Sequence, residues 1–415
     1  MKFVLGSAFA VSMVSAYSSL LDDCHTFAAL FDGTCGGVLS NAEDNYQMLA
    51  EDWSVSASGD SITCDAQTSE SEYMICPNSD ASADQCTVTR KNCVTCYRDD
   101  ATDIVYIQVQ SNGMPDHCYG SKQGLAEGEF AAYSPATFQM DWKAKWNLDV
   151  LAADWVYGLT DVDSTSLLTD IVCGIDTTSP GNIPEDRGYE TSVRFTDSEA
   201  LDGVVGVMLD NSFIYRAVDT VTTDSGVEAN GYDGYARDDD YPARTPQDIT
   251  DLCGHQIVGE NILAYRGLAA CMKEGSEFRS TTTAPQMCKE DDTCKDEYEL
   301  ATFGKDQAFS TPVNEEPMGI ARDGHIIVGP YNEDGELYGC DDVDVCNGTF
   351  LSDSSYAYVL TTKFPYAVGC WGGRSWHITQ PVEASCSVHA CQLGALQGLM
   401  ATGTLLAATL AALSI

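Results

Sequence analysis

The chain has 415 residues and a formal net charge of −42, which comes from 63 acidic and 21 basic side chains. Because the acids are spread along the chain, the surface repels nucleic-acid phosphates and anionic lipid headgroups, and we expect no nucleic-acid partner. The length allows two or three hydrophobic cores, so the 18 cysteines supplement cores rather than replace them.

Residues 1–16 are predicted to be a cleaved secretory signal. Lys2 is followed by a short apolar run and then by Val14-Ser15-Ala16, which has the small residues of a cleavage site. The run is too short for a membrane span, which needs roughly 20 apolar residues. The expected compartment is oxidising, and most cysteines should form disulfides.

Residues 393–415 are apolar and carry no charge, and residues 373–392 before them include small residues and a polar spacer. This order is typical of a glycosylphosphatidylinositol signal, with Ser385 as the candidate attachment residue. A C-terminal transmembrane helix is the alternative. The predicted location is the outer face of the plasma membrane, with the lipid in the outer leaflet, or the extracellular medium.

The N-terminal region, residues 17–100, is rich in cysteine and contains seven of them. Seven is odd, so one cysteine is expected to pair outside the region, with Cys118 as the candidate partner. Cys93 and Cys96 form a Cys-x-x-Cys pair, but a structural zinc site would normally need a second pair. Disulfides are therefore favoured over zinc.

The segment after this region alternates apolar and polar residues. Val105, Ile107 and Val109 recur at period two, which predicts a half-buried strand. Between residues 124 and 155 the aromatic residues fit either strands or one short helix.

Two stretches, residues 204–218 and 317–331, align without gaps. Each has an apolar strand, an Asp-Asn or Asp-Gly pair and a second apolar strand, which predicts two β-hairpins with type I′ turns. Downstream, Cys253 and Cys346 each follow an Asp-x pair, and a tyrosine lies twelve residues after each cysteine. Equal spacing indicates an internal duplication.

The predicted fold is therefore mainly β, with antiparallel sheets and hairpins, an internal duplication and many disulfides, after a Cys-rich N-terminal region. The disulfide candidates outside that region are Cys118, Cys253, Cys271, Cys340, Cys346 and Cys370.

Taken in order, these motifs resemble the YHYH domain family, which is named for a Tyr-His-Tyr-His strand. The resemblance covers residues 104–372, with repeat-like halves at about 201–272 and 315–371. It rests on the stretches "VQSNGMPDH", "VVGVMLDNSFIY", "DLCGH", "MGIARDGHIIVGPY" and "YAYVLTTKFPYAVGCW". Members of the family are secreted and have no established reaction, so the resemblance implies an architecture and a location.

The motif histidines of the family are missing from this chain. The motif positions hold Leu263, Ala264, Tyr265 and Arg266 in the first copy, and Tyr356, Ala357, Tyr358 and Val359 in the second. Alanine, arginine and valine neither bind a metal nor shuttle a proton near neutral pH. No catalytic residue is predicted.

The remaining candidates are few. His117 and His255 lie where the family also has histidine, and with Asp116 they could bind a transition metal. His325 is expected to face solvent. Asn347 begins an N-glycosylation sequon and is expected to carry a glycan. An acidic loop contains Asp334, Asp341, Asp342 and Asp344. A solvated loop is the favoured interpretation, and a calcium site is the alternative.

The leading hypothesis is a non-catalytic surface, adhesion or structural protein without a cofactor. Cell-surface glycans or other extracellular proteins are its candidate partners. The alternative is an extracellular protein that binds a metal ion (calcium or a transition metal) or a carbohydrate through His117, His255 and the acidic loops.

Overall fold

The computed structural model describes the chain in several ranges. They are residues 18–35, 57–65, 76, 85–99, 101–120, 140–147, 194–195, 203–219, 232–235, 245–258, 261–339, 342–343 and 346–369. The signal, Ser385, the apolar tail, Cys340, Cys370, Asp341 and Asp344 lie outside these ranges.

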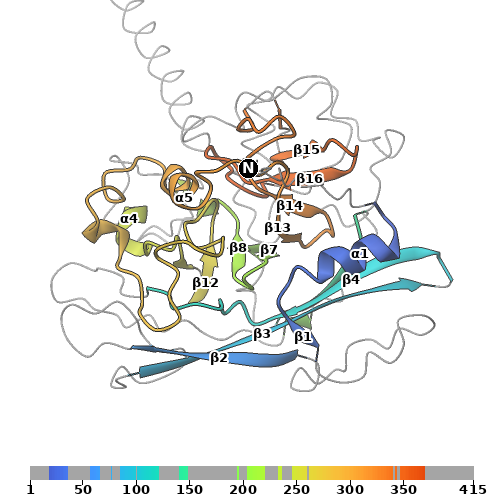
Figure 1. Cartoon of the computed structure of the whole chain (residues 1–415), viewed down its shortest axis with the longest axis horizontal. Coiled ribbons are helices and arrows are strands. Elements are labelled where there is room, and N and C mark those ends of the chain that lie inside the picture. Colours follow the sequence, from blue (N-terminus) through green and yellow to red (C-terminus); the bar gives the residue numbers. More distant parts are fainter. Residues whose placement is uncertain are drawn as a thin grey trace, which may run out of the picture.

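The first sheet has six strands, each antiparallel to its neighbours and arranged in chain order. They are β1 (Thr34–Cys35), β2 (Ala57–Asp65), β3 (Gln85–Asp99), β4 (Ile104–Ser111), β5 (Met140–Lys145) and β6 (Arg194–Phe195). Helix α1 (Leu21–Ala28) lies against β3 and β4 (Figure 1). The predicted boundary near residue 100 therefore crosses a single sheet, because residues 92–99 of β3 pair with β4.

The second sheet has eight strands in the order β11-β12-β8-β7-β13-β14-β16-β15. The first half of the duplication provides β7 (Val204–Met208), β8 (Phe213–Tyr215), β11 (Gln256–Val258) and β12 (Ile262–Tyr265). The second half provides β13 (Pro317–Ala321), β14 (Ile326–Val328), β15 (Gly348–Phe350) and β16 (Tyr356–Val359). A separate two-stranded sheet pairs β9 (Val218–Asp219) with β10 (Tyr232–Asp233). After α1, the described residues also form three short helices: α4 (Pro246–Ile249), η3 (Cys288–Glu290) and α5 (Leu300–Ala308).

The strand register confirms the duplication. Gly206 pairs with Ile214 as Gly319 pairs with Ile327, and both hairpins have a register shift just before the glycine. Tyr265 and Tyr358 occupy equivalent positions. Tyr265 on β12 pairs with Ile214 of the parallel strand β8, and Tyr358 on β16 pairs with Ile327 of the parallel strand β14. At the centre of the sheet, Val207 of β7 pairs with its own counterpart, Ile320 of β13. The two halves are therefore related by an approximate two-fold axis through this pair.

Both hairpins are present, but the predicted turn type is wrong. In the first hairpin Met208 N–H donates to Ser212 O and Asn211 N–H donates to Met208 O, at 2.9 Å each. Among the turn residues, Asn211 has a positive φ (76°) and Asp210 does not. Ala321, Gly324 and His325 repeat this bonding pattern in the second hairpin. Each loop thus has three residues and ends in the left-handed conformation, which Asn and Gly tolerate.

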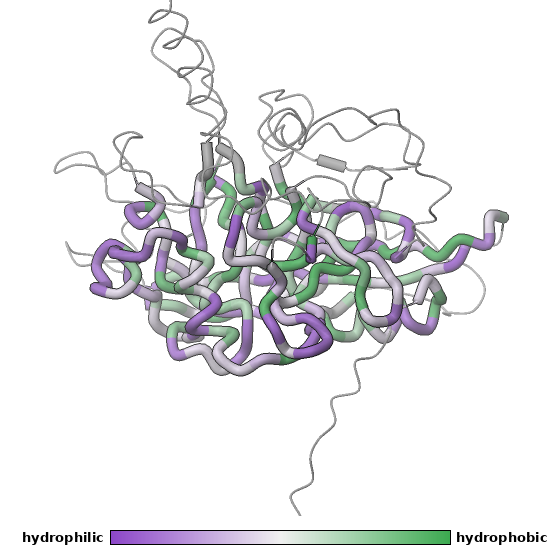
Figure 2. The backbone as a smooth tube through the Cα atoms, turned by 90° about the horizontal axis from the view of Figure 1, so that it is seen from above, coloured by the Kyte–Doolittle hydropathy of each residue, from purple (hydrophilic) through white to green (hydrophobic). Residues whose placement is uncertain are grey.

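The two sheets pack face to face and enclose an apolar core. Val109 and Trp142 of the first sheet contribute to it, together with Val207, Ile320 and Ala357 of the second. Figure 2 shows apolar stretches crossing the middle of the body and polar stretches in many outer loops. On its other face the second sheet packs against α5 and the loops, so it is covered on both sides.

Strand β4 was expected to be half-buried, and it is buried on both faces. Tyr106, Gln108 and Gln110 are enclosed along with the apolar residues between them. The cause is its central position: β3 and β5 flank it, and other parts of the chain cover both of its faces. The alternation correctly predicted a strand, but solvent exposure depends on packing that alternation does not encode.

Hairpin tips hold the sheets in place. At the first tip, Asn211 Nδ2 donates to Asn112 Oδ1 (3.1 Å) and Met114 O (2.9 Å), and Ser111 Oγ donates to Asn211 Oδ1 (2.7 Å). At the second tip, Asn147 N–H donates to Gly324 O at 2.9 Å. The tips therefore contact the ends of β4 and β5, and the "SNG" segment is a docking point for the first hairpin.

Six disulfides connect the described cysteines. The pairs are Cys24–Cys96, Cys35–Cys93, Cys64–Cys118, Cys76–Cys86, Cys253–Cys271 and Cys288–Cys294. Cys118 thus pairs with the odd cysteine of the N-terminal region, as predicted, and Cys93 and Cys96 are in disulfides rather than in a zinc site. Cys346 is disulfide-bonded as well. This bonding is consistent with an extracellular protein.

Within the described ranges, no helix is long and apolar enough to cross a bilayer.

We predict that Gly324→Ala destabilises the protein more than Gly275→Ala. Both glycines have φ near +86° (87° and 85°), so alanine costs about 1–2 kcal/mol of backbone strain at either site. A Cβ on Gly324 would lie 2.0 Å from Lys145 O, whereas a Cβ on Gly275 would meet nothing within 4 Å. Displacing β5 should add about 1–3 kcal/mol at Gly324. Urea unfolding of both variants measures the difference, and equal losses would contradict this docking.

Candidate functional site

The structure brings His117 next to His255 of the first half of the duplication. His117 lies in the loop after β4 and His255 directly precedes β11. Their ring centroids are 5.2 Å apart, and neither side chain is exposed to solvent (0%). Tyr265 stacks on His255 at a centroid distance of 4.2 Å. Two segments separated by more than a hundred residues thus form one buried cluster.

The "DLCGH" segment forms a tight turn that places His255. Gly254 N–H donates to Asp251 O (2.9 Å), and Gly254 has φ 95° and a Cβ position blocked by Ala269. Asp251 Oδ1 accepts His255 N–H at 2.7 Å, and Oδ2 accepts Gly120 N–H at 2.6 Å. The carboxylate of Asp251 therefore connects this turn to the loop that carries His117.

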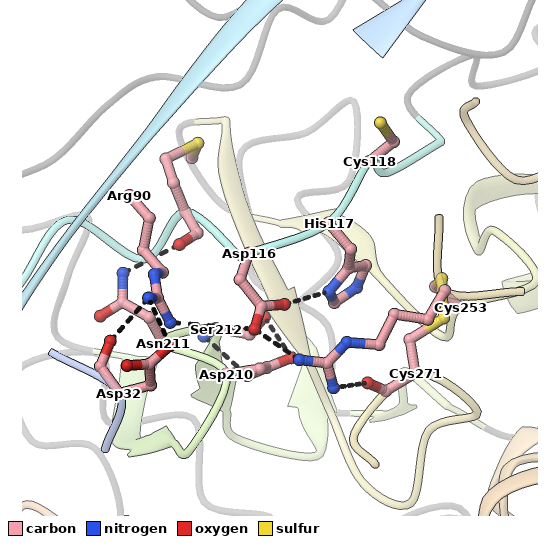
Figure 3. A network of polar contacts seen from close by, with 12 residues as sticks. Asp32, Arg90, Asp116, His117, Cys118, Asp210, Asn211, Ser212, Cys253 and Cys271 are labelled. Carbon is pink, nitrogen blue, oxygen red and sulfur yellow. Dashed lines mark hydrogen bonds and ion pairs between the residues drawn. A yellow bond between two sulfur atoms is a disulfide. The ribbon is translucent and has the colours of Figure 1, made fainter. Parts of the chain in front are cut away.

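Asp116 orients His117. Asp116 Oδ1 lies 2.9 Å from His117 Nδ1, and its Oδ2 accepts a charged hydrogen bond from Arg279 at 2.5 Å. Arg90 lies on the other side of this carboxylate at 3.8 Å (Figure 3). Burial acts to raise the pKa of Asp116, but the hydrogen bond with His117 and the charge of Arg279 outweigh it and lower that pKa to about 2. The carboxyl group of Asp116 is therefore ionised, and both of its oxygens have partners among His117, Arg279 and Arg90.

Burial lowers the pKa of His117, and the nearby His255 lowers it further, although the bond to Asp116 opposes both effects. His117 is therefore neutral near physiological pH. Because its Nδ1 carries the proton shared with Asp116, its Nε2 keeps a lone pair.

A chain of hydrogen bonds connects the two imidazoles. Tyr265 Oη lies 3.5 Å from His117 Nε2 and donates to Asp210 Oδ2 at 2.9 Å. Ser212 Oγ donates to the same Asp210 oxygen at 3.1 Å and lies 3.1 Å from His255 Nε2. While the single hydroxyl proton of Ser212 is donated to Asp210, a neutral His255 ring donates from Nε2 to Ser212, and this tautomer leaves a lone pair on His255 Nδ1. Burial and Asp210 both raise the pKa of Tyr265, so its phenol remains protonated.

Ser212, His255 and Asp251 have the order of a hydrolytic triad. The distances are 3.1 Å from Ser212 Oγ to His255 Nε2 and 3.4 Å from His255 Nδ1 to Asp251 Oδ2. However, His255 Nδ1 makes no hydrogen bond, and all three side chains are buried, Ser212 completely (0%). A nucleophile must reach its substrate, and this hydroxyl is enclosed and already donates to Asp210. The arrangement therefore favours a structural role for Ser212.

The second half repeats part of the cluster. Tyr358 Oη donates to Asp323 Oδ2 at 2.5 Å, as Tyr265 does to Asp210. His325 takes the position of Ser212, and its Nδ1 lies 3.0 Å from the same Asp323 oxygen. The expectation that His325 faces solvent is wrong: only 6% of it is exposed, because Tyr356 and Tyr358 pack edge-on against its ring.

The degenerate motif positions are buried and point to alternate faces of the sheet. Ala264, Ala357 and Val359 face the core between the two sheets, whereas Tyr265 and Tyr358 face the opposite core. Leu263 and Tyr356 are buried too. Arg266 is fully buried and is held by Gln256 Oε1 (2.7 Å) and Arg216 O (2.9 Å). A histidine at Ala357 or Val359 would therefore lie between the sheets.

Of the three residues proposed to bind a metal, His117 and His255 lie next to each other. The carboxylate of Asp116 instead bonds with Arg279 and with His117 Nδ1. The third potential ligand beside the two histidines is Cys253, whose donor atom lies within 4.8 Å of theirs. Its sulfur is bonded to Cys271, so it offers no thiolate in this state. In the proposed calcium loop, Asp342 Oδ2 accepts Gly339 N–H at 2.7 Å.

The expected glycan on Asn347 does not fit the folded structure. Asn347 is completely buried (0%), and its Nδ2 donates to Val359 O (2.6 Å) and Thr361 Oγ1 (3.1 Å). A glycan needs this same nitrogen in an exposed position. Asn347 instead connects the turn before β15 to β16.

Several residues of the cluster were missed from the sequence. Asp210 and Asp251 belong to motifs that were noticed for their turns, and the Asp-x-Cys spacing that Asp251 shares with its counterpart in the second half was a usable signal. Ser212 and Arg279 gave no signal, because their contacts depend on the tertiary fold.

Comparison of the whole chain with protein-family models, with curated proteins and with solved structures gives no match. The architecture and the cluster must therefore be interpreted from their own geometry.

We predict that His117 makes the protein less stable below pH 6.5 in metal-free buffer. The native pKa of His117 is lowered, so between that value and 6.5 the unfolded state binds more protons than the native state. Stability should therefore fall with falling pH, by roughly 1.4 kcal/mol per pH unit at most. Urea unfolding of the wild type and His117→Gln between pH 5 and 7.5 measures this slope. The same slope in both proteins would contradict the assignment.

Proposed function

We propose that this chain is a non-catalytic protein of the outer cell surface, secreted and held by a lipid anchor, with a body similar to YHYH domains. Its role is structural or adhesive. The disulfides support an extracellular location, and the duplicated sheet supports a rigid scaffold. The signal at residues 1–16, the attachment at Ser385 and the membership of the YHYH family are parts of this proposal.

The single observation that carries the proposal is the enclosure of the candidate chemical groups. His117, His255 and Ser212 are completely buried (0%), and Asp116 and Asp210 are held by hydrogen bonds or ion pairs to neighbouring side chains. Polar groups that are buried and hydrogen-bonded to one another stabilise a unique packing. A reaction site needs a route for its substrate and groups that are free to react.

The enclosure also argues against the carbohydrate-binding alternative. A sugar platform requires aromatic or polar side chains at the surface, whereas Tyr265, Tyr358 and Tyr366 are each 0% exposed. Sugar recognition through His117 or His255 would need the same access. If glycans are partners, they are bound by other surfaces of this acidic protein.

The proposal is tested on cells that express the full chain. We expect phosphatidylinositol-specific phospholipase C to release most of the protein, whereas a chain ended after residue 392 should enter the medium without treatment. The released, oxidised protein should hold less than about 0.1 metal ion per chain after dialysis, and chelation should leave its Tm unchanged, because Cys253 and Asp116 are engaged. Retention on treated cells would contradict the anchor, and a stoichiometric metal would contradict the role without a cofactor.

A further inference from the structure

The His117–His255 cluster contains two nitrogen lone pairs that nothing satisfies fully. His255 Nδ1 is a buried polar atom without a hydrogen-bond partner. It also lies 3.4 Å from the carboxylate of Asp251, where a bare lone pair is unfavourable and a cation would be stabilised. His117 Nε2 has only the long contact of 3.5 Å to Tyr265, whose proton is donated to Asp210.

The orientation of His117 is that of a metal ligand. A histidine that binds a metal usually donates its other ring N–H to a carboxylate, which fixes the tautomer and raises the basicity of the ligating nitrogen. Asp116 forms this contact with His117 Nδ1 at 2.9 Å, and Arg279 holds Asp116 in place. Asp251 has a different relation to His255: its carboxylate lies 3.4 Å from Nδ1, the nitrogen that keeps the lone pair, and its negative charge would stabilise a cation bound there.

The third donor is Cys253. Its sulfur and one nitrogen of each histidine all lie within 4.8 Å of one another, and all three residues are buried. Two imidazoles and a thiolate form a ligand set that suits Zn²⁺ and similar borderline metals, with a fourth position left open. The disulfide to Cys271 is what withholds the thiolate.

We infer that the Cys253–Cys271 disulfide controls a transition-metal site formed by His117, His255 and Cys253, which is closed when the disulfide is oxidised and binds one divalent ion of the Zn²⁺ class when it is reduced. This inference goes beyond the surface role and does not depend on it. The oxidised protein remains metal-free, as the proposed function requires.

The reductant belongs to the class of thiols. Two thiol groups reduce the bond: the S–S bond breaks, Cys253 and Cys271 each gain one electron and one proton, and the two reductant sulfurs join in a disulfide. The metal then replaces the proton of the Cys253 thiol, and this proton passes to solvent.

The test uses variants in which Cys253 is freed without any reductant. Cys271→Ser leaves Cys253 as a thiol and all other disulfides intact. We expect this ectodomain to bind one equivalent of Co²⁺, with near-ultraviolet absorption from a thiolate-to-metal transition and visible bands of tetrahedral cobalt. Excess Zn²⁺ should remove both signals.

Two matched controls separate ligation from the loss of the disulfide. The double variant Cys253→Ser/Cys271→Ser loses the same disulfide but has no thiol, and it should show no thiolate absorption. Adding His117→Gln to Cys271→Ser should weaken Co²⁺ binding at least tenfold. Absence of the thiolate band in folded Cys271→Ser, or an unchanged affinity with His117→Gln, would overturn the inference.

A second measurement covers the case in which Cys271→Ser does not fold. The wild-type ectodomain is reduced by dithiothreitol under native conditions and alkylated with iodoacetamide, with and without Zn²⁺. Mass spectrometry should show at least tenfold slower alkylation of Cys253 with Zn²⁺ and little change at Cys271. Equal effects of Zn²⁺ on the two cysteines would overturn the inference.

Discussion

The structure depends on the packing of the eight-stranded sheet against the six-stranded sheet. The approximate two-fold axis of the duplication passes between Val207 and Ile320, and both residues lie in the core between the sheets. Most strand residues that face this core are therefore small or apolar. Ala264, Ala357 and Val359, which align with the histidine positions of the YHYH motif that the chain resembles, are such residues. A pair of imidazoles there would be buried without partners, at a cost of several kcal/mol.

On the opposite face, polar contacts fix the hairpins. An aspartate at the tip of each hairpin accepts a hydrogen bond from a tyrosine on a neighbouring parallel strand: Asp210 from Tyr265, and Asp323 from Tyr358. The halves diverge around this shared contact. The first half adds His255 and recruits His117, whereas the second has Gly348 in the place of His255. Tyr356 fills the space beside Gly348. Both halves therefore share the same strand scaffold, but only the first half forms a cluster with two imidazoles.

The sequence predicted what depends on local patterns and spacing. It predicted both hairpins, the duplication and the pairing of Cys118 with the N-terminal region. These predictions depend only on turn residues, motif spacing and the number of cysteines, which can be read directly from the sequence. It also placed His117 and His255 together, through the resemblance to the YHYH motifs. The structure adds the register that makes the halves equivalent.

The remaining features depend on tertiary packing. The burial of His325, the enclosure of Asn347 and the role of Arg279 follow from segments that are distant in sequence. Asp116 appeared to be a ligand because its partners, Arg279 and Arg90, could not be located. The turn type was wrong because the length of a hairpin loop is set by its closing hydrogen bonds, which the sequence does not show.

The central claim is that His117 and His255 form an enclosed network rather than an open reaction site. Modification of the native, oxidised protein by diethyl pyrocarbonate, followed by mass spectrometry, tests it directly. His25 is partly exposed on α1 and serves as the internal reference. We expect His25 to react at least ten times faster than His117 and His255, which are 0% exposed. Reaction of His117 or His255 at the rate of His25 would show that the cluster is open to small molecules and would contradict the account.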